Sequence, residues 1–433
     1  MFWAVSFSNQ LIILLYIIFN YLTPVPVTPR NLEKKISLLR RTMNLSDEDV
    51  RIMLAKQPAI LHYSAERNLG STIIFLVRAL DLSKGELRSM VMGSPSILGY
   101  SKENLSRKLS FFVNTLGYID NNYVEGMERV RKLLVGTPKL LLAAVDTGLM
   151  PRFQFLRNEI EFSLEELQLL YEKNPRLLLY SLDENMREKI VFFLILQLHI
   201  EPEQVRKLML SFPQVMDYNL PNHLKPIAEY YMADLGFSAS ELGSIVTRFP
   251  RLFSYSLFKI KHVTGFLRFE LGLDANQVKR VIFQSPQIVG LDTEGNLKQK
   301  LDLLQTRLSL TGHELGLVLS KMPTLMNLGI DNNLLPKLQY LEQVVNDVID
   351  SDDVKSMVLK QPTLLGYSLK KRIRPRMEKI VSAGLSADKV TVGISMSENK
   401  FLEWLASSKL RRKRQVDVHK NSKGVQEASK TFY

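Results

Sequence analysis

Residues 46–64 read SDEDVRIMLAKQPAILHYS, and the pattern of this stretch recurs along the chain. Ser46 stands twelve residues before Pro58, and the apolar residues Val50 and Leu54 stand eight and four residues before it. Apolar residues four positions apart form one stripe of a helix. Because proline disfavours helical geometry at the residue before it, this first helix should end there. The residues after Pro58 then predict a second helical segment.

Nine prolines share this context and divide the chain into repeats. They are Pro58, Pro95, Pro138, Pro175, Pro213, Pro250, Pro286, Pro323 and Pro362, with spacings of 37, 43, 37, 38, 37, 36, 37 and 39 residues. We interpret YIDNNY at residues 118–123, which accounts for the longest spacing, as a surface insertion. A repeat of this length cannot bury its own apolar stripe, so the repeats must stack. The sequence therefore predicts an all-α fold, a superhelical α-solenoid of about nine repeats.

The start of most first helices is also encoded. Position −12, counted from the repeat proline, holds an N-cap residue in seven repeats: Ser46, Ser83, Ser163, Ser238, Asp274, Thr311 and Asp350. Position −9 then holds an acid or a glutamine, which would complete a capping box. An apolar residue precedes each cap and is placed to pack on position −8. We expect these seven helices to begin at their caps.

The two ends of the chain differ from the repeats. Residues 1–30 contain the apolar run 11–19 and no charged side chain before Arg30. We interpret them as a targeting leader, with a membrane anchor or a misplaced start codon as alternatives. Residues 409–433 hold eight Lys or Arg against two acids and predict a basic, flexible tail. The repeat array is predicted to span residues 31–408.

The composition favours a polyanionic partner. The 433 residues carry a net charge of +13, which suits nucleic acid or an anionic membrane surface. The chain has no cysteine, and its six histidines are scattered without ligand spacing, so we expect no metal or other cofactor. Motifs for phosphate-binding loops and for nucleophiles are also absent from the sequence, and we expect the protein not to be an enzyme.

The repeat resembles that of the mitochondrial transcription termination factor (mTERF) family. The stretches that carry the resemblance are KQPAILHYS at 56–64, NPRLLLYS at 174–181, QPTLLGYS at 361–368 and the closing segment SENKFLEW at 397–404. The resemblance covers about residues 31–408. It implies a curved superhelix that binds double-stranded DNA, or RNA in some members, inside mitochondria or plastids. Transcription termination or regulation, organelle RNA maturation and ribosome assembly are the roles it implies.

Two positions in the second helix repeatedly carry cations. Position +12 holds Arg107, Arg187, Lys225, His262, Lys298 and Arg374, and position +14 holds Arg152, Lys189, Lys300, Lys337 and Arg376. Cations spaced by a repeating unit can follow the phosphates of a nucleic acid. We predict that these Lys and Arg side chains contact nucleic acid. The alternative is a solvated helix face paired with nearby acids.

Two further rows are predicted to be structural. Cations at position −2 complement the dipole at the C-terminus of a helix. They are Lys56, Lys173, Arg248, Lys321 and Lys360. We expect the tyrosines at position +5 to pack between repeats rather than to stack on bases. They are Tyr63, Tyr100, Tyr180, Tyr218, Tyr255 and Tyr367.

The leading hypothesis is a monomer that binds organellar duplex DNA, with no small-molecule substrate. RNA binding and a role as a protein-interaction scaffold are the two alternatives. The apolar leader favours a plastid over a mitochondrion.

Overall fold

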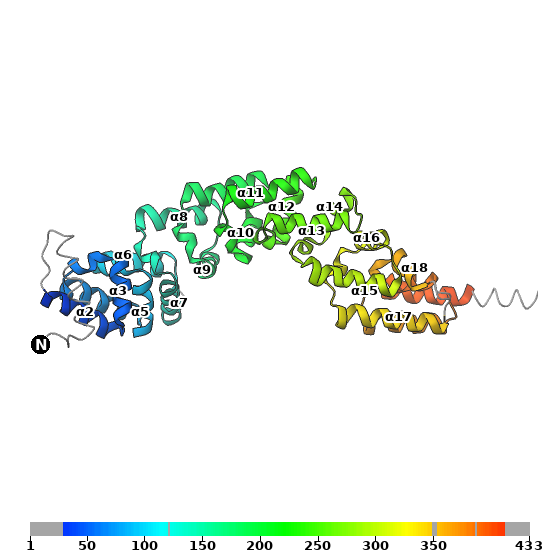
Figure 1. Cartoon of the computed structure of the whole chain (residues 1–433), viewed down its shortest axis with the longest axis horizontal. Coiled ribbons are helices and arrows are strands. Elements are labelled where there is room, and N and C mark those ends of the chain that lie inside the picture. The colour runs from blue at the N-terminus through cyan, green and yellow to red at the C-terminus, as the bar shows by residue number, and fades with distance from the viewer. Residues whose placement is uncertain (1–28, 120–121, 349–352, 386–387, 412–433) are drawn as a thin grey trace, which may run out of the picture. The chain divides into compact units, whose positions relative to one another are not determined.

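The computed structural model describes residues 29–119, 122–348, 353–385 and 388–411, and all regular structure within these ranges is helical (Figure 1). The prediction of an all-α repeat fold is confirmed. Most of the predicted leader and most of the predicted tail lie outside the described residues. Among the residues described, no helix has both the length and the apolar character needed to cross a membrane.

Each repeat begins with a first helix that ends just before the repeat proline. The nine first helices are α3 (Asp47–Lys56), α5 (Lys84–Gly93), α7 (Tyr123–Gly136), α9 (Leu164–Lys173), α10 (Pro202–Ser211), α12 (Ala239–Arg248), α14 (Ala275–Gln284), α16 (Gly312–Lys321) and α18 (Asp353–Lys360). Every proline then opens a 3-10 turn, as its fixed φ angle and missing N–H favour at a first helical position. These turns are η1 (Pro58–His62), η3 (Pro95–Gly99), η5 (Pro138–Leu142), η8 (Pro175–Leu179), η10 (Pro213–Asp217), η13 (Pro250–Ser254), η14 (Pro286–Gly290), η16 (Pro323–Asn327) and η18 (Pro362–Gly366).

A second helix follows each turn, and in most repeats part of it is wound as a π-helix with i→i+5 hydrogen bonds. The second helices comprise η2–α4 (65–80), α6–η4 (102–115), η6–α8–η7 (145–159), η9 (Leu182–Gln197), η11–α11–η12 (220–234), α13 (Leu257–Phe269), η15–α15 (293–308), η17–α17 (330–348) and η19–α19 (369–382). Helix α2 (Pro29–Met43) precedes the first repeat, and α20 (Asp388–Ser395) and a helix at 398–411 follow the last.

The predicted caps are present wherever the structure describes them. Six cap side chains each accept a hydrogen bond from the backbone N–H at N3, and the backbone N–H of each cap residue donates to an oxygen of the N3 side chain; these caps are Ser46, Ser83, Ser163, Ser238, Asp274 and Thr311. The seventh predicted cap, Asp350, lies outside the described residues. In the third repeat, Asn122 accepts from the backbone of Val124 and Glu125 and caps α7. The sequence pattern missed this cap because α7 begins earlier than its counterparts.

The longer third repeat corrects our interpretation of residues 118–123 as a surface insertion. Helix α7 has 14 residues, whereas α3, α5 and α9 have 10 each. Tyr118 is buried, and its hydroxyl donates to the carbonyl of Gln168 at 3.2 Å. Tyr123 is exposed and forms the first residue of α7. Part of the extra sequence therefore lengthens a helix, and part of it joins the core.

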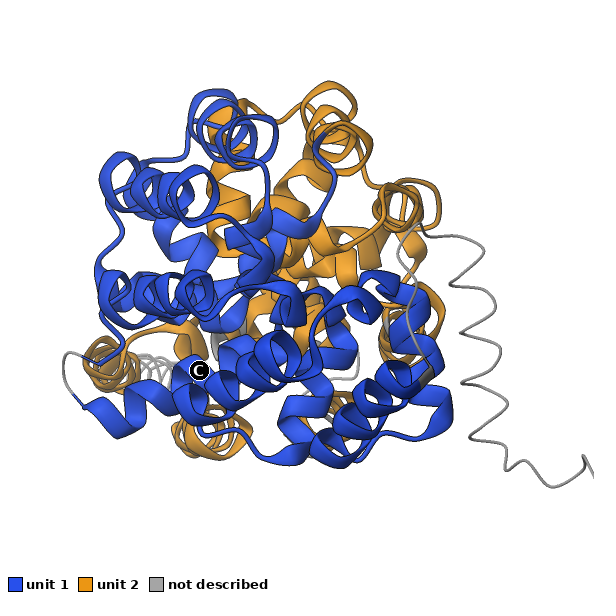
Figure 2. Cartoon of the chain, turned by 90° about the vertical axis from the view of Figure 1, so that its left-hand side faces the viewer, with its two compact units in different colours: residues 1–220 blue, residues 221–433 orange. Residues whose placement is uncertain are grey.

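The core consists of the same positions in every repeat. The apolar residues at positions +2 and +3 are at most 2% exposed in all nine repeats, from Ile60 and Leu61 to Leu364 and Leu365. The chain divides into two compact units, residues 1–220 and 221–433, which Figure 2 colours separately. In unit 1, η1, η3, η5 and η8 contact one another in order, and in unit 2 the same holds for η13, η14, η16 and η18. Stacking of the turns thus continues the core from repeat to repeat.

The tyrosines at position +5 pack against position +4 of the next repeat. Tyr100 donates its hydroxyl hydrogen to the carbonyl of Leu142 at 3.3 Å, and Tyr180 donates to the carboxylate of Asp217. Tyr255 lies against Gly290, where any side chain would collide with its hydroxyl. These contacts confirm the structural interpretation of the tyrosine row for the three tyrosines named here.

Replacing the cap residue of α5 tests the encoded helix start. Ser83→Ala removes the acceptor for the backbone N–H of Glu86 and should lower the free energy of unfolding by about 1 kcal/mol. Ser89→Ala is the control, because Ser89 is an exposed residue within the same helix, where alanine is favoured. Urea denaturation followed by circular dichroism measures both. Equal stability of the two variants would refute the role of the cap.

Adding one methyl group at Gly290 tests the tyrosine contact. Gly290→Ala should destabilise the protein by about 1–3 kcal/mol, because the new Cβ overlaps the Tyr255 hydroxyl. The double variant Gly290→Ala/Tyr255→Phe should recover most of that loss. Gly329→Ala is the matched control, since nothing lies within 4 Å of a Cβ there. If thermal melting shows no rescue in the double variant, the contact does not constrain position +4.

Candidate nucleic-acid interface

The lysines at position +14 lie inside the contact between repeats. Lys189, Lys300 and Lys337 are 4–6% exposed, and each donates to the carbonyl at position +3 of the next repeat. The Nζ–O distance is 2.6 Å both for Lys189 to Met216 and for Lys337 to Leu365. Burial lowers the pKa of all three ammonium groups. These side chains therefore form a hydrogen bond between repeats.

Other cations make the same kind of bond. Lys35 of α2 donates to the carbonyl of Leu61 at 2.5 Å, and Lys108 of α6, at position +13, donates to the carbonyl of Leu141. Both acceptors lie at position +3 of the repeat that follows. Lys108 also lies 3.7 Å from the centre of the Tyr100 ring. We call the hydrogen bonds that these five residues donate the lysine bonds between repeats; the donors are Lys35, Lys108, Lys189, Lys300 and Lys337.

The two arginines at position +14 also bind backbone carbonyls. Arg152 donates its Nε–H to the carbonyl of Tyr180. Arg376 is 5% exposed, donates to the carbonyl of Met396 at 2.6 Å and pairs with the carboxylate of Glu398 at 2.5 Å. All five residues predicted at position +14 thus donate to backbone carbonyls within the protein; four of them are buried and Arg152 is half-buried. The structure thus separates this row from the remaining predicted contacts.

The cations at position +12 lie at or near the surface. Arg107 pairs with Asp146 at 2.7 Å, and Lys298 pairs with Glu294 at 3.3 Å. The half-buried Arg187 makes two hydrogen bonds to Glu159, at 2.5 and 2.9 Å, and lies over the ring of Phe155. These pairs match the alternative we considered, a solvated face paired with acids. Exposed ion pairs contribute at most about 1 kcal/mol, so a phosphate can replace the acid.

The remaining members of this row lie in unit 2. Arg374 is exposed and lies over the ring of Tyr340, 5.1 Å from its centre. Lys225 is half-buried at the start of α11, and the ring of His262 hydrogen-bonds to the hydroxyl of Thr293 at 2.9 Å. The structure therefore places Arg107 and Arg187 on second helices of unit 1, and Lys225, Lys298 and Arg374 on second helices of unit 2.

The cations at position −2 bind the neighbouring first helix. Lys56, Lys173, Arg248 and Lys321 donate to the carbonyls of Met92, Leu210, Phe283 and Leu359, at 3.0, 2.7, 2.9 and 3.0 Å. Each acceptor is at position −3 of the next repeat, where a helix end leaves carbonyls without partners. The structural interpretation of these four residues is confirmed, with the next helix as an acceptor in all four and the carbonyl of Ser244 in its own helix as a second acceptor for Arg248.

A further row of ion pairs was not predicted. Cations at position −7 pair with the capping-box acid at position −9 of the preceding repeat; the pairs are Arg88–Asp49 at 2.8 Å, Arg131–Glu86 at 3.5 Å, Lys279–Glu241 at 2.8 Å and Lys355–Glu314 at 3.0 Å. The backbone of Ser46 and the guanidinium of Arg88 lower the pKa of Asp49 to about 2. Aligning positions −7 and −9 would have revealed this pairing.

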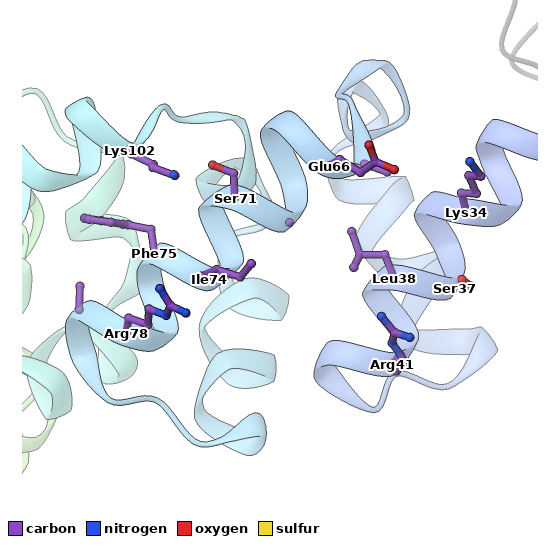
Figure 3. Close-up of a pocket in the computed structure, with 13 residues that line it drawn as sticks. Lys34, Ser37, Leu38, Arg41, Glu66, Ser71, Ile74, Phe75, Arg78 and Lys102 are labelled. Atoms are coloured by element: carbon purple, nitrogen blue, oxygen red, sulfur yellow. The ribbon is translucent and has the colours of Figure 1, made fainter.

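The sequence rows also missed a basic groove between α2, η2–α4 and α6, which we call the α2–α4 groove (Figure 3). Its volume is about 910 Å³. Four of its lining residues are cations: Lys34, Arg41, Arg78 and Lys102. Glu66 is the one acid among its lining residues. This groove concentrates positive charge at one place in unit 1, in contrast to the paired cations at position +12.

The lysine bonds can be tested through their pH dependence. Burial lowers the pKa of Lys108 to about 8, and the unfolded value is about 10.4. Between these values the unfolded chain holds more protons on Lys108 than the folded protein does, so the contribution of this residue to stability rises with pH. The urea midpoint of the wild type relative to Lys108→Met should therefore increase from about pH 7.5 to 9.5. The exposed Lys132→Met serves as control, and a pH-independent difference for Lys108→Met would contradict the assignment.

Comparison with known proteins supports the repeat assignment. A family model, mTERF, matches residues 13–158 and 126–383, which together span most of the chain. None of the curated proteins matches the chain. The two matched ranges include the lysine bonds and the capped first helices described above. The chain therefore belongs to the mTERF family of organellar, nucleic-acid-binding proteins with a helical repeat fold.

Proposed function

We propose that the protein binds double-stranded DNA of an organelle as a monomer and regulates or terminates its transcription. The observation that carries this proposal is the row of exposed cations at position +12. Arg107, Lys298 and Arg374 occupy equivalent positions on three second helices, and each side chain is exposed. Cations that recur with the repeat match a polymer whose charge also recurs. Membership of the mTERF family supports nucleic acid as that polymer.

The existing ion pairs of this row are compatible with DNA binding. In the Arg107–Asp146 pair, the side chains are 65% and 75% exposed, so water screens their attraction. A cation bound to DNA is attracted by several neighbouring phosphates at once, and condensed counterions leave the DNA when the protein binds. Exchange of a single acid for a polyanion is therefore favourable at low salt.

We further propose a plastid as the compartment, on the apolar composition of residues 1–30. Those residues fall mainly outside the described ranges, so this proposal depends on sequence. Expression of the full chain with a fluorescent protein at its C-terminus would test it, and a mitochondrial signal would reject it.

RNA is the second candidate ligand. The α2–α4 groove favours it, because apolar side chains line the groove beside its cations. Apolar and aromatic surface suits the unpaired bases of RNA loops better than the paired bases of a duplex. Competition of a labelled DNA duplex by a structured RNA and by an unlabelled duplex of equal length separates the two candidates.

Neutralising three cations of the +12 row tests the proposed interface. For Arg107→Gln/Lys298→Gln/Arg374→Gln, the slope of log Kobs against log salt should become shallower by about 2.7, because each lost phosphate contact contributes about 0.9 for duplex DNA. Fluorescence anisotropy with a duplex of about 30 base pairs, between about 50 and 200 mM salt, gives this slope.

The control carries the same change of charge on first helices. Arg51, Lys132 and Lys207 each pair with an acid on their own helix, as Lys298 does. The triple variant Arg51→Gln/Lys132→Gln/Lys207→Gln should leave the slope nearly unchanged. Equal loss in the two triple variants would show that total charge, and not the +12 row, governs binding.

A further inference from the structure

We propose that the α2–α4 groove binds an unpaired strand of nucleic acid, with phosphates held by its cations and bases placed against its apolar side chains. This inference rests on the proposed function, because it assumes that the ligand is a nucleic acid. The ligand proposed here is an unpaired strand rather than a duplex, and its site is a part of unit 1 that the recurring cation rows do not include.

The cations of the groove are available to a ligand. Lys34 and Arg41 project from α2, Arg78 from α4 and Lys102 from the first residue of α6 (Figure 3). All four are exposed, and none makes an ion pair or hydrogen bond with any residue that the structure describes. By contrast, the five lysines of the lysine bonds, and most cations at positions −2 and −7, already contact carbonyls or acids of the protein. Free cations that face one groove attract an anion without first breaking a protein contact.

The apolar lining distinguishes this groove from a simple phosphate site. Leu38 of α2 and Ile74 of α4 lie on facing sides of it, and Ile74 is 53% exposed (Figure 3). Phe75 is half-buried and lines the same groove as Lys102. A duplex presents phosphates but keeps the faces of its bases stacked inside. An unpaired strand presents phosphates and base faces together, and aromatic side chains beside cations bind such strands.

The groove is specific to the start of the repeat array. Arg41 and Arg78 are 37 residues apart and therefore occupy equivalent positions on α2 and on the second helix of the first repeat. The next two repeats carry Thr115 and Asn158 at this position, and a later one carries Glu270. The pair of arginines is thus confined to α2 and the second helix of the first repeat, where the groove lies.

Neutralising the two arginines provides the test. The full-length Arg41→Gln/Arg78→Gln variant is compared with the wild type on a labelled oligouridylate and a labelled oligothymidylate of about 15 nucleotides. Losing two phosphate contacts should make the salt slope for these single strands shallower by about 1.4, since each contributes about 0.7. Affinity for the DNA duplex should remain within about twofold, because the +12 row is intact.

A second variant separates base contact from charge. Phe75→Leu preserves an apolar side chain and every cation of the groove. It should weaken binding of the oligouridylate by at least about fivefold, because stacking on the ring is lost, while the salt slope stays as in the wild type. Melting curves from circular dichroism establish that both groove variants are folded.

The matched control removes two positive charges elsewhere in unit 1. Lys139 and Arg176 are both exposed and stand at position +1 of neighbouring repeats. The variant Lys139→Gln/Arg176→Gln should bind single strands as the wild type does. If it weakens binding as much as Arg41→Gln/Arg78→Gln, the groove has no special role and the inference is overturned.

The remaining outcomes separate this inference from the proposed function. Failure of the wild type to bind any nucleic acid would reject both, whereas duplex binding without single-strand binding would reject the groove alone. Poly-L-glutamate is the competitor that represents an acidic protein partner. If it displaces the oligouridylate from the wild type as effectively as unlabelled oligouridylate does, charge alone determines binding and the nucleic-acid assignment fails.

Discussion

A hydrogen bond from a buried lysine to a carbonyl of the next repeat fixes the stacking at five places along the array. Each repeat proline ends one helix and opens a 3-10 turn, whose carbonyls point into the contact between repeats. Buried carbonyls without partners are costly. The missing donor comes from the helix that precedes the turn, and it is supplied by Lys35 of α2 and, from second helices, by Lys108, Lys189, Lys300 and Lys337. The same bond satisfies a buried ammonium group, which would otherwise be unfavourable in an apolar environment.

This arrangement changes the meaning of the basic composition. A net charge of +13 suggests a surface devoted to a polyanion, yet many of the recurring cations hold the protein together. Lys173 reaches the end of the next first helix, and Lys279 reaches the capping-box acid of the preceding one. The charge available for a ligand is therefore local. It resides in exposed residues such as Arg374 and in the α2–α4 groove.

Much of the fold could be predicted because its signals are local. Ser83 and Glu86 cap α5 as their spacing indicates, and the prolines end the first helices as backbone geometry requires. The cation rows were harder to interpret, because Arg187 and Lys189 look alike in sequence. Side chains two positions apart on a helix point about 200° apart around its axis. One row therefore faces the solvent when the other faces the next repeat. The tertiary contact decides which is which, and periodicity alone does not contain it.

The register of the lysine bonds also constrains how such a chain can change in length during evolution. Each acceptor lies at position +3 of the repeat that follows the donor, so gain or loss of one whole repeat keeps donor and acceptor in register wherever the neighbouring helix carries the lysine. A partial deletion would leave a buried ammonium group facing the wrong backbone. The extra residues of the third repeat obey this rule, because they extend the N-terminal end of α7 and leave Pro138 and Leu141 in place. Growth by complete modules, with tolerated additions before a helix start, is the path that this chemistry leaves open.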